Sequence, residues 1–218
     1  MAKNNRVGKR KSRRQVEEVE PKLGHYSIVT DTEETEKNYF YGLRDSLPVD
    51  LQRNIVIKVS PKVLTHKLVK KCLEISRYNP SYSEPWIIFD RDEVKDFDKI
   101  IDDAERNGIN VGWSNPCFEV WLSSYFGNIP YTDTSVKCCN EFSNIYKKKT
   151  NIDYKKSNEN LYRNLIKFGN EDKAIERSKN KRKNFERDGI NKPSEMFPCT
   201  TVDALVEEIR NKIEKTSE

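Results

Sequence analysis

Residues 85–93 read Pro85-Trp86-Ile87-Ile88-Phe89-Asp90-Arg91-Asp92-Glu93, a short apolar run that ends abruptly in acidic residues. Aromatic and β-branched side chains over this length predict a buried strand from Trp86 to Asp90. A second short run with apolar residues, from His25 to Thr30, is likewise followed directly by an acidic residue, Asp31. We therefore expect two strands of one sheet whose ends carry carboxylates.

Two further strands and four helices complete an expected α/β unit. β-branched residues predict a strand over residues 54–60, and another follows over residues 109–113. The expected helices are residues 34–46, residues 61–77, a helix from the N-cap Asp96 to Gly108, and a compact helix that Pro116 opens. Strands that alternate with helices predict a mainly parallel sheet sandwiched by helices, with right-handed crossovers. The expected α/β domain spans residues 23–130.

The segments on either side of this unit differ from it. Residues 1–22 lack hydrophobic periodicity, and the first fourteen hold seven Lys and Arg with no acid, which predicts a basic, flexible arm. Only helical periods follow from residue 131, so we expect a helical extension, residues 131–218, packed on the core and ending in a helix over residues 201–215. Residues 147–192 hold fifteen Lys and Arg against seven Asp and Glu, which suits a polyanion or, equally, a solvated helix surface.

Composition narrows the class of protein. The chain has 218 residues, 35% hydrophobic and 34% charged, which is enough for one core with an attached subdomain. No apolar stretch reaches the roughly 20 residues of a membrane helix. Acidic residues rather than an apolar region follow the basic start, so no signal peptide is expected, and a cytoplasmic location follows.

The five cysteines show no Cys-x-x-Cys pair, and only two histidines are present. This pattern disfavours a structural zinc site and favours reduced thiols in the core or on the surface. Reduced thiols agree with a reducing compartment.

The carboxyl ends of parallel strands meet at one edge of a sheet, where such folds bind ligands. Asp31 and Asp90 fall at two such ends although 59 positions separate them. Asp92 completes an Asp-x-Asp pair, and Glu119 stands in the first turn of the helix after Pro116. Carboxylate oxygens are hard ligands that suit Mg²⁺ or Mn²⁺, ions that commonly serve phosphoryl chemistry. The pattern therefore favours a metal-dependent enzyme that acts on phosphodiesters.

Each acidic position also has a structural interpretation, and the residues alone leave both open. Asp31 or Thr32 suits the N-cap of a helix, and the glutamates that follow suit its positive N-terminal dipole. The Asp-x-Asp pair suits a turn. Glu119 suits a helix start, or it accepts a hydrogen bond from Ser114 or Asn115.

Three segments resemble a known family. They are Ile28-Val29-Thr30-Asp31-Thr32-Glu33-Glu34-Thr35-Glu36-Lys37-Asn38-Tyr39-Phe40, Phe89-Asp90-Arg91-Asp92-Glu93, and Trp113-Ser114-Asn115-Pro116-Cys117-Phe118-Glu119-Val120-Trp121-Leu122. In this order they resemble the RloB-like proteins, which are bacterial, defence-associated proteins related to Toprim nucleases. The likeness extends to residues 153–156 and 200–206.

The resemblance implies roles for individual residues. Toprim domains place a glutamate after the first strand as general acid or base, and an Asp-x-Asp after a later strand to hold Mg²⁺. By position, Asp31 replaces that glutamate and Thr32 replaces the glycine that usually follows it, whereas the Asp-x-Asp is intact. Together with the residue pattern, this gives three sets of candidates. The candidate catalytic residues are Asp31, Glu36, Asp90 and Asp92; the candidate metal ligands are Asp31, Asp90, Asp92 and Glu119; and the candidate substrate-binding residues are Thr35, Ser114, Asn115, Lys155 and Lys156.

The resulting hypothesis is a Toprim-like, Mg²⁺- or Mn²⁺-dependent nuclease that acts as the effector of an antiphage system. Its substrate is DNA or RNA, with tRNA included, and the resemblance implies an AAA-type ATPase partner from a neighbouring gene. Whether the chain forms a homo-oligomer stays open. One alternative is a catalytically impaired binding or sensor subunit, which the Asp31 and Thr32 departures favour. A nucleotidyl or phosphoryl transferase is less favoured, because no glycine-rich phosphate loop accompanies the acids.

Overall fold

The computed structural model describes residues 22–217 except residues 50, 54–55, 80–81, 93, 129–130 and 132–133. A five-stranded sheet of order β2-β1-β3-β4-β5 forms its centre. The strands are β1 (Lys22–Thr30), β2 (Val56–Ser60), β3 (Tyr82–Asp90), β4 (Asn110–Asn115) and β5 (Cys199–Thr200). The first four run parallel, and β5 is antiparallel to β4. The predicted α/β fold is confirmed, with a mixed, mostly parallel sheet. Of the expected basic arm, residues 1–21 lie outside the described residues, and residue 22 already belongs to β1.

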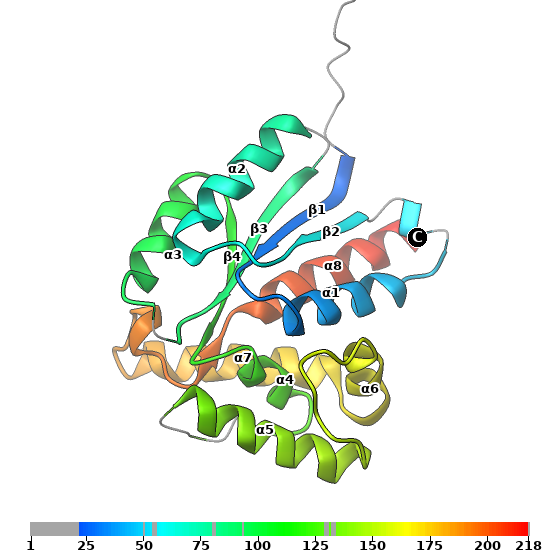
Figure 1. Cartoon of the computed structure of the whole chain (residues 1–218), viewed down its shortest axis with the longest axis vertical. Helices are drawn as coiled ribbons and strands as arrows, with labels where there is room; N and C mark the ends of the chain where they lie inside the picture. The colour runs from blue at the N-terminus through cyan, green and yellow to red at the C-terminus, as the bar shows by residue number, and fades with distance from the viewer. Residues whose placement is uncertain are drawn as a thin grey trace, which may run out of the picture.

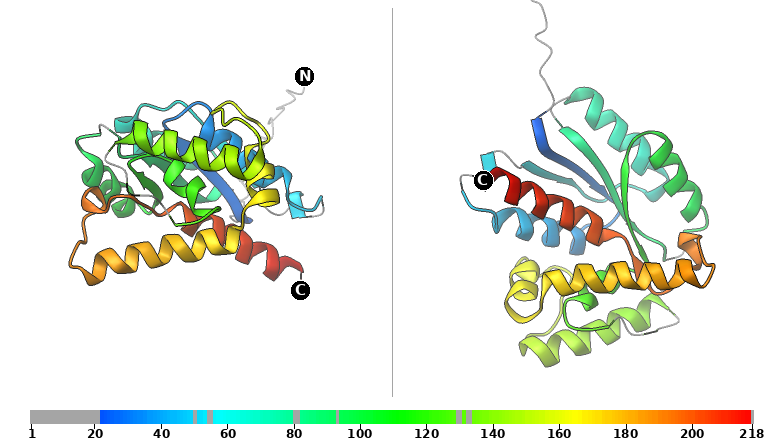
Figure 2. Two further views of the ribbon diagram at one scale, coloured as in Figure 1. Left: turned by 90° about the horizontal axis from the view of Figure 1, so that it is seen from below. Right: turned by 180° about the vertical axis from the view of Figure 1, so that it is seen from behind.

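Helices cover both faces of the sheet. They are α1 (Thr35–Asp45), α2 (Leu68–Tyr78), α3 (Phe97–Arg106), α4 (Glu119–Ser124), α5 (Ser135–Thr150), α6 (Leu161–Phe168), α7 (Glu171–Arg187) and α8 (Val202–Ser217). In Figure 1, α2 and α3 lie on one face, α1 and α8 lie on the other, and α4 to α7 form a further layer where the parallel strands end. Figure 2 shows α5 and α7 as two long helices on either side of that layer.

The two-residue period of a strand divides the core between these faces. In β3, Trp86 and Ile88 join the cluster that includes α1 and α8, whereas Ile87 and Phe89 join the cluster under α2 and α3. The alternation fixes the register of β3, because a shift of one residue would exchange the two sets. It also fixes where the strand ends, and therefore where Asp90 stands.

The predicted helix over residues 61–77 begins too early. Residues 61–64 are not helical, and α2 starts at Leu68 after a 3₁₀ turn, Thr65–Lys67. The cause is a pair of backbone hydrogen bonds to the end of β1, because the Lys62 amide donates to Thr32 O at 2.9 Å and the Val63 amide donates to Thr30 O at 3.1 Å. These bonds hold the loop beside the first acidic segment.

The expectation of helices alone after residue 131 is wrong, because β5 adds a strand to the sheet edge. Two residues are too few to show an alternating pattern. A side-chain contact and a backbone hydrogen bond hold the strand in place: Ser114 Oγ and Thr200 Oγ1 are 3.1 Å apart, and the Thr201 amide donates to Trp113 O at 2.9 Å. This contact brings α8 back to the sheet.

The boundary between the α/β unit and a helical extension stays a prediction. One hydrophobic cluster includes residues of β1 and β3 together with residues of α4 to α8. The final helix lies against the sheet beside α1, which Figure 2 shows from behind. Within the described residues, no helix is both long and apolar enough to cross a bilayer.

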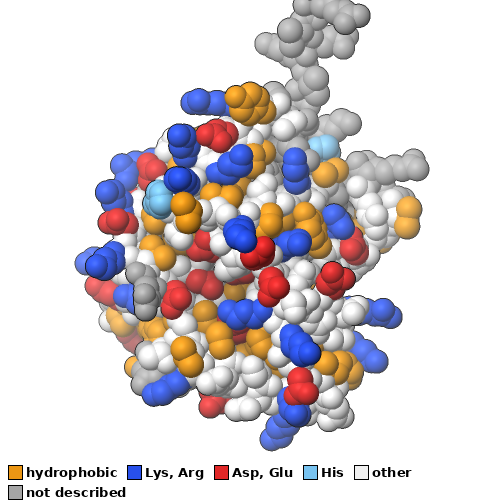
Figure 3. Space-filling model, in the orientation of Figure 1, with side chains coloured by type: hydrophobic (Ala, Val, Ile, Leu, Met, Phe, Trp, Pro, Cys, Tyr) orange, Lys and Arg blue, Asp and Glu red, His pale blue; other side chains and the backbone are white. Residues whose placement is uncertain are grey.

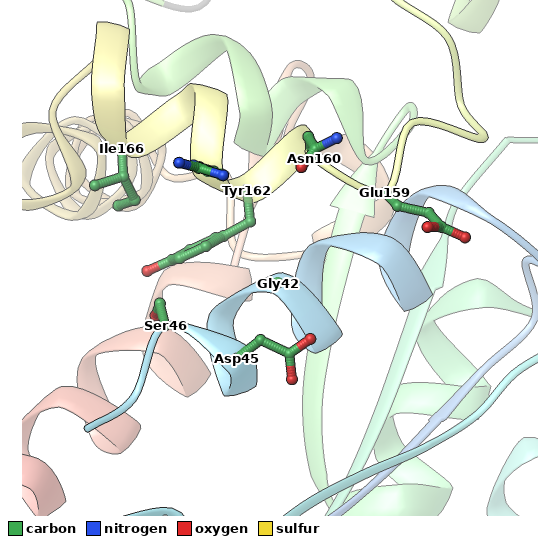
Figure 4. A pocket seen from close by; sticks show the side chains of 8 residues that line it. Gly42, Asp45, Ser46, Glu159, Asn160, Tyr162 and Ile166 are labelled. Carbon is green, nitrogen blue, oxygen red and sulfur yellow. The ribbon is translucent and has the colours of Figure 1, made fainter. Parts of the chain in front are cut away.

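A close contact joins α1 to α6. A Cβ atom built on Gly42 would lie 2.6 Å from Tyr162 Cβ, far inside van der Waals contact. Figure 4 shows this contact at the edge of a cavity of about 460 Å³ between the two elements. Gly42→Ala should therefore force the helices apart, costing about 1–3 kcal/mol against a helix-propensity gain of about 1 kcal/mol.

We expect a net loss in the free energy of unfolding of about 1 kcal/mol, measured by urea denaturation. Gly127→Ala is the matched control, because nothing lies within 4 Å of its added Cβ and its backbone is not left-handed. Equal losses in the two variants would show that the α1–α6 contact has no special cost.

Candidate functional site

A pocket of about 200 Å³ opens where β1 and β3 end and α4 begins. Its lining includes Thr32, Thr35, Glu36, Asp90, Glu119 and Lys156. Figure 3 shows acidic side chains gathered across the middle of this face, at the level where the strands of Figure 1 end. The structure thus brings together carboxylates from three separate parts of the sequence.

Asp31 stands immediately after β1 and is held by the loop that precedes α2. Thr65 Oγ1 donates a hydrogen bond to Asp31 Oδ2 at 3.1 Å, and Oδ1 is buried without a partner among the described residues. Burial raises the pKa of Asp31 to about 6, although the Thr65 bond opposes this. The alternative in which Asp31 or Thr32 caps α1 is wrong, because the N-cap residue is Glu34.

Glu36 and Asp90 are the most strongly perturbed acids of the pocket. The Glu36 side chain is fully buried, and neither carboxylate oxygen has a hydrogen-bond partner in the described part of the chain. Burial, followed by the charges of Asp31 and Glu119, raises the pKa of Glu36 to about 8. Burial also raises the pKa of Asp90 well above its usual range, with the charge of Glu36 next in importance. The carboxylates therefore lie close enough to repel one another.

Asp92 follows the lining residue Asp90 by two positions but does not itself line the pocket, so we place it at the rim. Its backbone is left-handed, with φ of 27°, and its side chain is exposed. Ser135 Oγ donates to Asp92 Oδ1 at 2.7 Å, which ties the rim to the start of α5. The Asp92 charge contributes to the raised pKa of Asp31, so the two acids are electrostatic neighbours.

Glu119 is the first residue of α4 and is 1% exposed. Tyr154 Oη donates to its Oε1 at 2.9 Å, and Lys156 Nζ lies 3.6 Å from the same oxygen. Burial alone would lower the pKa of Lys156, but Glu119 and the other acids raise it to about 12. Asn38 Nδ2 donates to Lys156 O at 3.1 Å and fixes this loop over α1.

The remaining predicted substrate-binding residues differ in position. Thr35 lines the pocket, whereas Lys155 is exposed outside its lining. Ser114 and Asn115 are fully buried, and their side chains make contacts within the protein. Ser114 pairs with Thr200, and Asn115 Nδ2 donates to Pro193 O at 3.1 Å. Their role in substrate binding stays a prediction.

Two contacts of the site were not foreseen. Thr65 falls in a stretch that was expected to be an ordinary helix, and nothing in its local pattern points to Asp31. Tyr154 belongs to the short segment 153–156 that the resemblance includes, which was the available signal for its contact with Glu119.

The pocket suits a hard cation with an incomplete set of protein ligands. Unpartnered buried oxygens on Asp31, Glu36 and Asp90 are costly without a positive charge. In the described residues, no three of these carboxylates bring oxygens within 4.8 Å of one another. Mg²⁺ usually takes one or two carboxylates and completes its shell with waters and phosphates, so it does not require three close carboxylates.

The stability of the metal-free protein should fall as pH rises. Glu36 binds its proton more tightly in the folded protein, with a pKa of about 8, than in the unfolded chain, where the value is 4.5. Between these values the folded state holds more protons, so each unit of pH removes up to ~1.4 kcal/mol of stability. Thermal midpoints in EDTA from pH 5 to 8 should decline, and Glu36→Gln should decline less. A wild-type slope no steeper than that of the variant would contradict the assignment.

Comparison with known proteins gives the family. Residues 26–209 match the RloB-like protein family. No curated protein and no solved structure matches the chain. The match includes every residue of the pocket described above, from β1 to the first half of α8. The chain therefore belongs to the RloB-like protein family.

Proposed function

We propose that this protein is a metal-dependent nuclease of the Toprim type, acting as an antiphage effector under the control of an AAA-type ATPase. The observation that carries the proposal is the convergence of Asp31, Glu36 and Asp90 with buried oxygens that no described group satisfies. A metal ion bound together with a phosphate group of the substrate would satisfy these oxygens.

Each residue of the pocket would have a role that follows from its charge and burial. Asp31 and Asp90 would hold Mg²⁺ or Mn²⁺, with Asp92 and Glu119 beside them. The bound ion would supply Lewis acidity and neutralise charge on the phosphodiester. Glu36 lies beside these carboxylates, and in the metal-free protein burial and their charges raise its pKa to about 8. It would act as the proton-transfer group next to the ion. Lys156 keeps its positive charge in the pocket and is suited to bind a phosphate oxygen.

A basic groove beside the pocket supports a nucleic-acid substrate. A cavity of about 580 Å³ between α2 and α3 has more basic than acidic residues in its lining. The basic ones are His66, Lys70, Lys95, Lys99 and Arg106, the acidic ones are Asp96 and Asp103, and Thr65 also lines it. Thr65 also donates a hydrogen bond to Asp31, so one residue of the groove contacts the candidate site. Contacts of this kind bind the phosphate backbone with little reading of sequence. The helices over residues 147–192 would add further contacts.

The test is cleavage by the full-length protein. End-labelled tRNA and supercoiled plasmid are incubated with Mg²⁺, with Mn²⁺ or with EDTA, each with and without the ATPase from the neighbouring gene. We expect cleavage that needs the metal and is lost when both Asp90 and Asp92 become alanine. Cleavage that persists in EDTA or in the double variant would falsify the site.

The same experiment separates the alternative of a binding or sensor subunit. Asp31 is one methylene shorter than the glutamate usual in the family, and its Oδ2 is engaged by Thr65. If nucleic acid or the ATPase is bound but no metal produces cleavage, the sensor interpretation replaces the nuclease.

A further inference from the structure

A second cluster of metal-ligating side chains lies behind the acidic pocket. Cys117 comes just before α4, and Cys139 lies in the second turn of α5. Their Sγ atoms are 3.8 Å apart. One ligand atom from each of Cys117, Cys139 and Glu119 lies within 4.8 Å of the other two. The absence of a Cys-x-x-Cys pair concealed this cluster, since the fold brings together thiols 22 residues apart.

The geometry matches a tetrahedral thiolate site. With zinc–sulfur bonds of about 2.3 Å, two thiolates on one tetrahedral ion are separated by about 3.8 Å. One Glu119 oxygen lies within 4.8 Å of both sulfur atoms, so a small rotation of this side chain would complete three ligands. Soft sulfur ligands select zinc-like ions over Mg²⁺, whereas the acidic pocket offers oxygen alone. The two neighbouring sites therefore differ in the ion that they prefer.

The three residues of the thiol cluster differ in burial. Cys117 and Glu119 are buried, and Val120 packs beside Cys117. Cys139 is half-buried, so an ion can reach the cluster through its thiol. Three protein ligands leave the fourth tetrahedral position for water, as in an exchangeable site rather than a closed structural one.

We propose that Cys117, Cys139 and Glu119 form a binding site for a soft divalent transition-metal ion such as Zn²⁺. Binding breaks the two S–H bonds, forms two metal–sulfur bonds and one metal–oxygen bond, and releases the thiol protons to solvent. Glu119 would turn from Tyr154 and Lys156 toward the ion.

Cobalt binding tests the site without any assay of activity. The full-length protein, reduced and free of oxygen, is titrated with Co²⁺ and then with Zn²⁺. We expect a near-ultraviolet thiolate-to-cobalt charge-transfer band, lost on adding Zn²⁺, and release of about two protons per ion. Cys139→Ala should remove the band or weaken binding by at least the ~10–100-fold that loss of an outer-sphere partner costs. Cys117→Ala should do the same.

Cys138→Ala is the matched control. Its thiol neighbours Cys117 but is not one of the three ligands that share the 4.8 Å cluster. The band should survive in this variant, and thermal midpoints confirm that all variants are folded. No thiolate band in the wild type, or a band that needs Cys138 but not Cys139, overturns the proposal.

A consequence for activity rests on the proposed function. Because Glu119 belongs to both sites, Zn²⁺ at the thiols would withdraw it from the acidic pocket and inhibit Mg²⁺-dependent cleavage. Cys139→Ala should then resist inhibition by Zn²⁺. If the nuclease hypothesis fails, cleavage is absent under all conditions while the cobalt spectrum still reports on the thiol site.

Discussion

Asp90→Asn should reduce metal-dependent cleavage by about 10³-fold, since charge stabilisation by a catalytic ion is worth several kcal/mol and each ~1.4 kcal/mol is a factor of ten. The side chain ends β3 inside the acidic pocket, and Asp31, Glu36 and Glu119 all act on its pKa. The substitution keeps the volume of the side chain and removes only its charge. The measurement is single-turnover cleavage of a labelled substrate across a Mg²⁺ titration.

Two variants give this result its meaning. Asp92→Asn should lose less activity than Asp90→Asn, because Asp92 is exposed at the rim and one of its oxygens already accepts from Ser135. Asp102→Asn removes an exposed charge on α3, away from the pocket lining, and should cut at the wild-type rate. Equal activity in the Asp90 and Asp102 variants would place the chemistry elsewhere.

Arg182→Ala should lower the free energy of unfolding by about 3–5 kcal/mol, the usual cost of leaving one member of a buried ion pair alone. Arg182 Nη1 and Nη2 donate to the two oxygens of Asp203 at 2.6 Å each, and Arg182 also donates to Thr200 O. Asp203 is fully buried, and burial raises its pKa in spite of the arginine. The pair joins α7 to α8 and to β5, so its loss should loosen the sheet edge. Chemical denaturation measures the change.

A neighbouring pair on the same two helices provides the control. Lys179 and Glu207 also form an ion pair, but their side chains are 39% and 37% exposed. Lys179→Ala should therefore cost at most about 1 kcal/mol. Adding Asp203→Asn to Arg182→Ala should recover much of the loss, because the buried charge is then gone. If Lys179→Ala and Arg182→Ala lowered the free energy of unfolding equally, burial would not explain the importance of the Arg182–Asp203 pair.

The sequence predicted most of the α/β core because its signals are local. β3 and its acidic end follow from Trp86 to Asp90 alone, and the helix after Asp31 follows from a regular apolar stripe. The convergence of Asp31 and Asp90 also follows from local signals, once parallel strands are expected to end at one edge. The sequence also indicates Glu36 and Lys156 as site residues, but the burial of Glu36 and the charge coupling of both residues are properties of the folded pocket.

What escaped prediction depends on contacts between distant segments. Residues 61–64 are not helical because two of their backbone amides donate to carbonyls at and just after the end of β1, and no periodicity in the sequence indicates such bonds. β5 is too short for a pattern and is fixed by Ser114 and Thr201. The thiol cluster likewise requires α4 and α5 to meet, which spacing along the chain cannot indicate.

The hydrogen bond between Thr65 and Asp31 limits how this aspartate can coordinate an ion. Oδ2 accepts the Thr65 hydroxyl hydrogen, whereas Oδ1 has no partner among the described residues, so under the proposed function Oδ1 would be the oxygen that approaches the ion. The hydroxyl also orients the Asp31 carboxylate in the metal-free protein. The direction of this carboxylate is thus set jointly by the first and second crossover connections of the sheet.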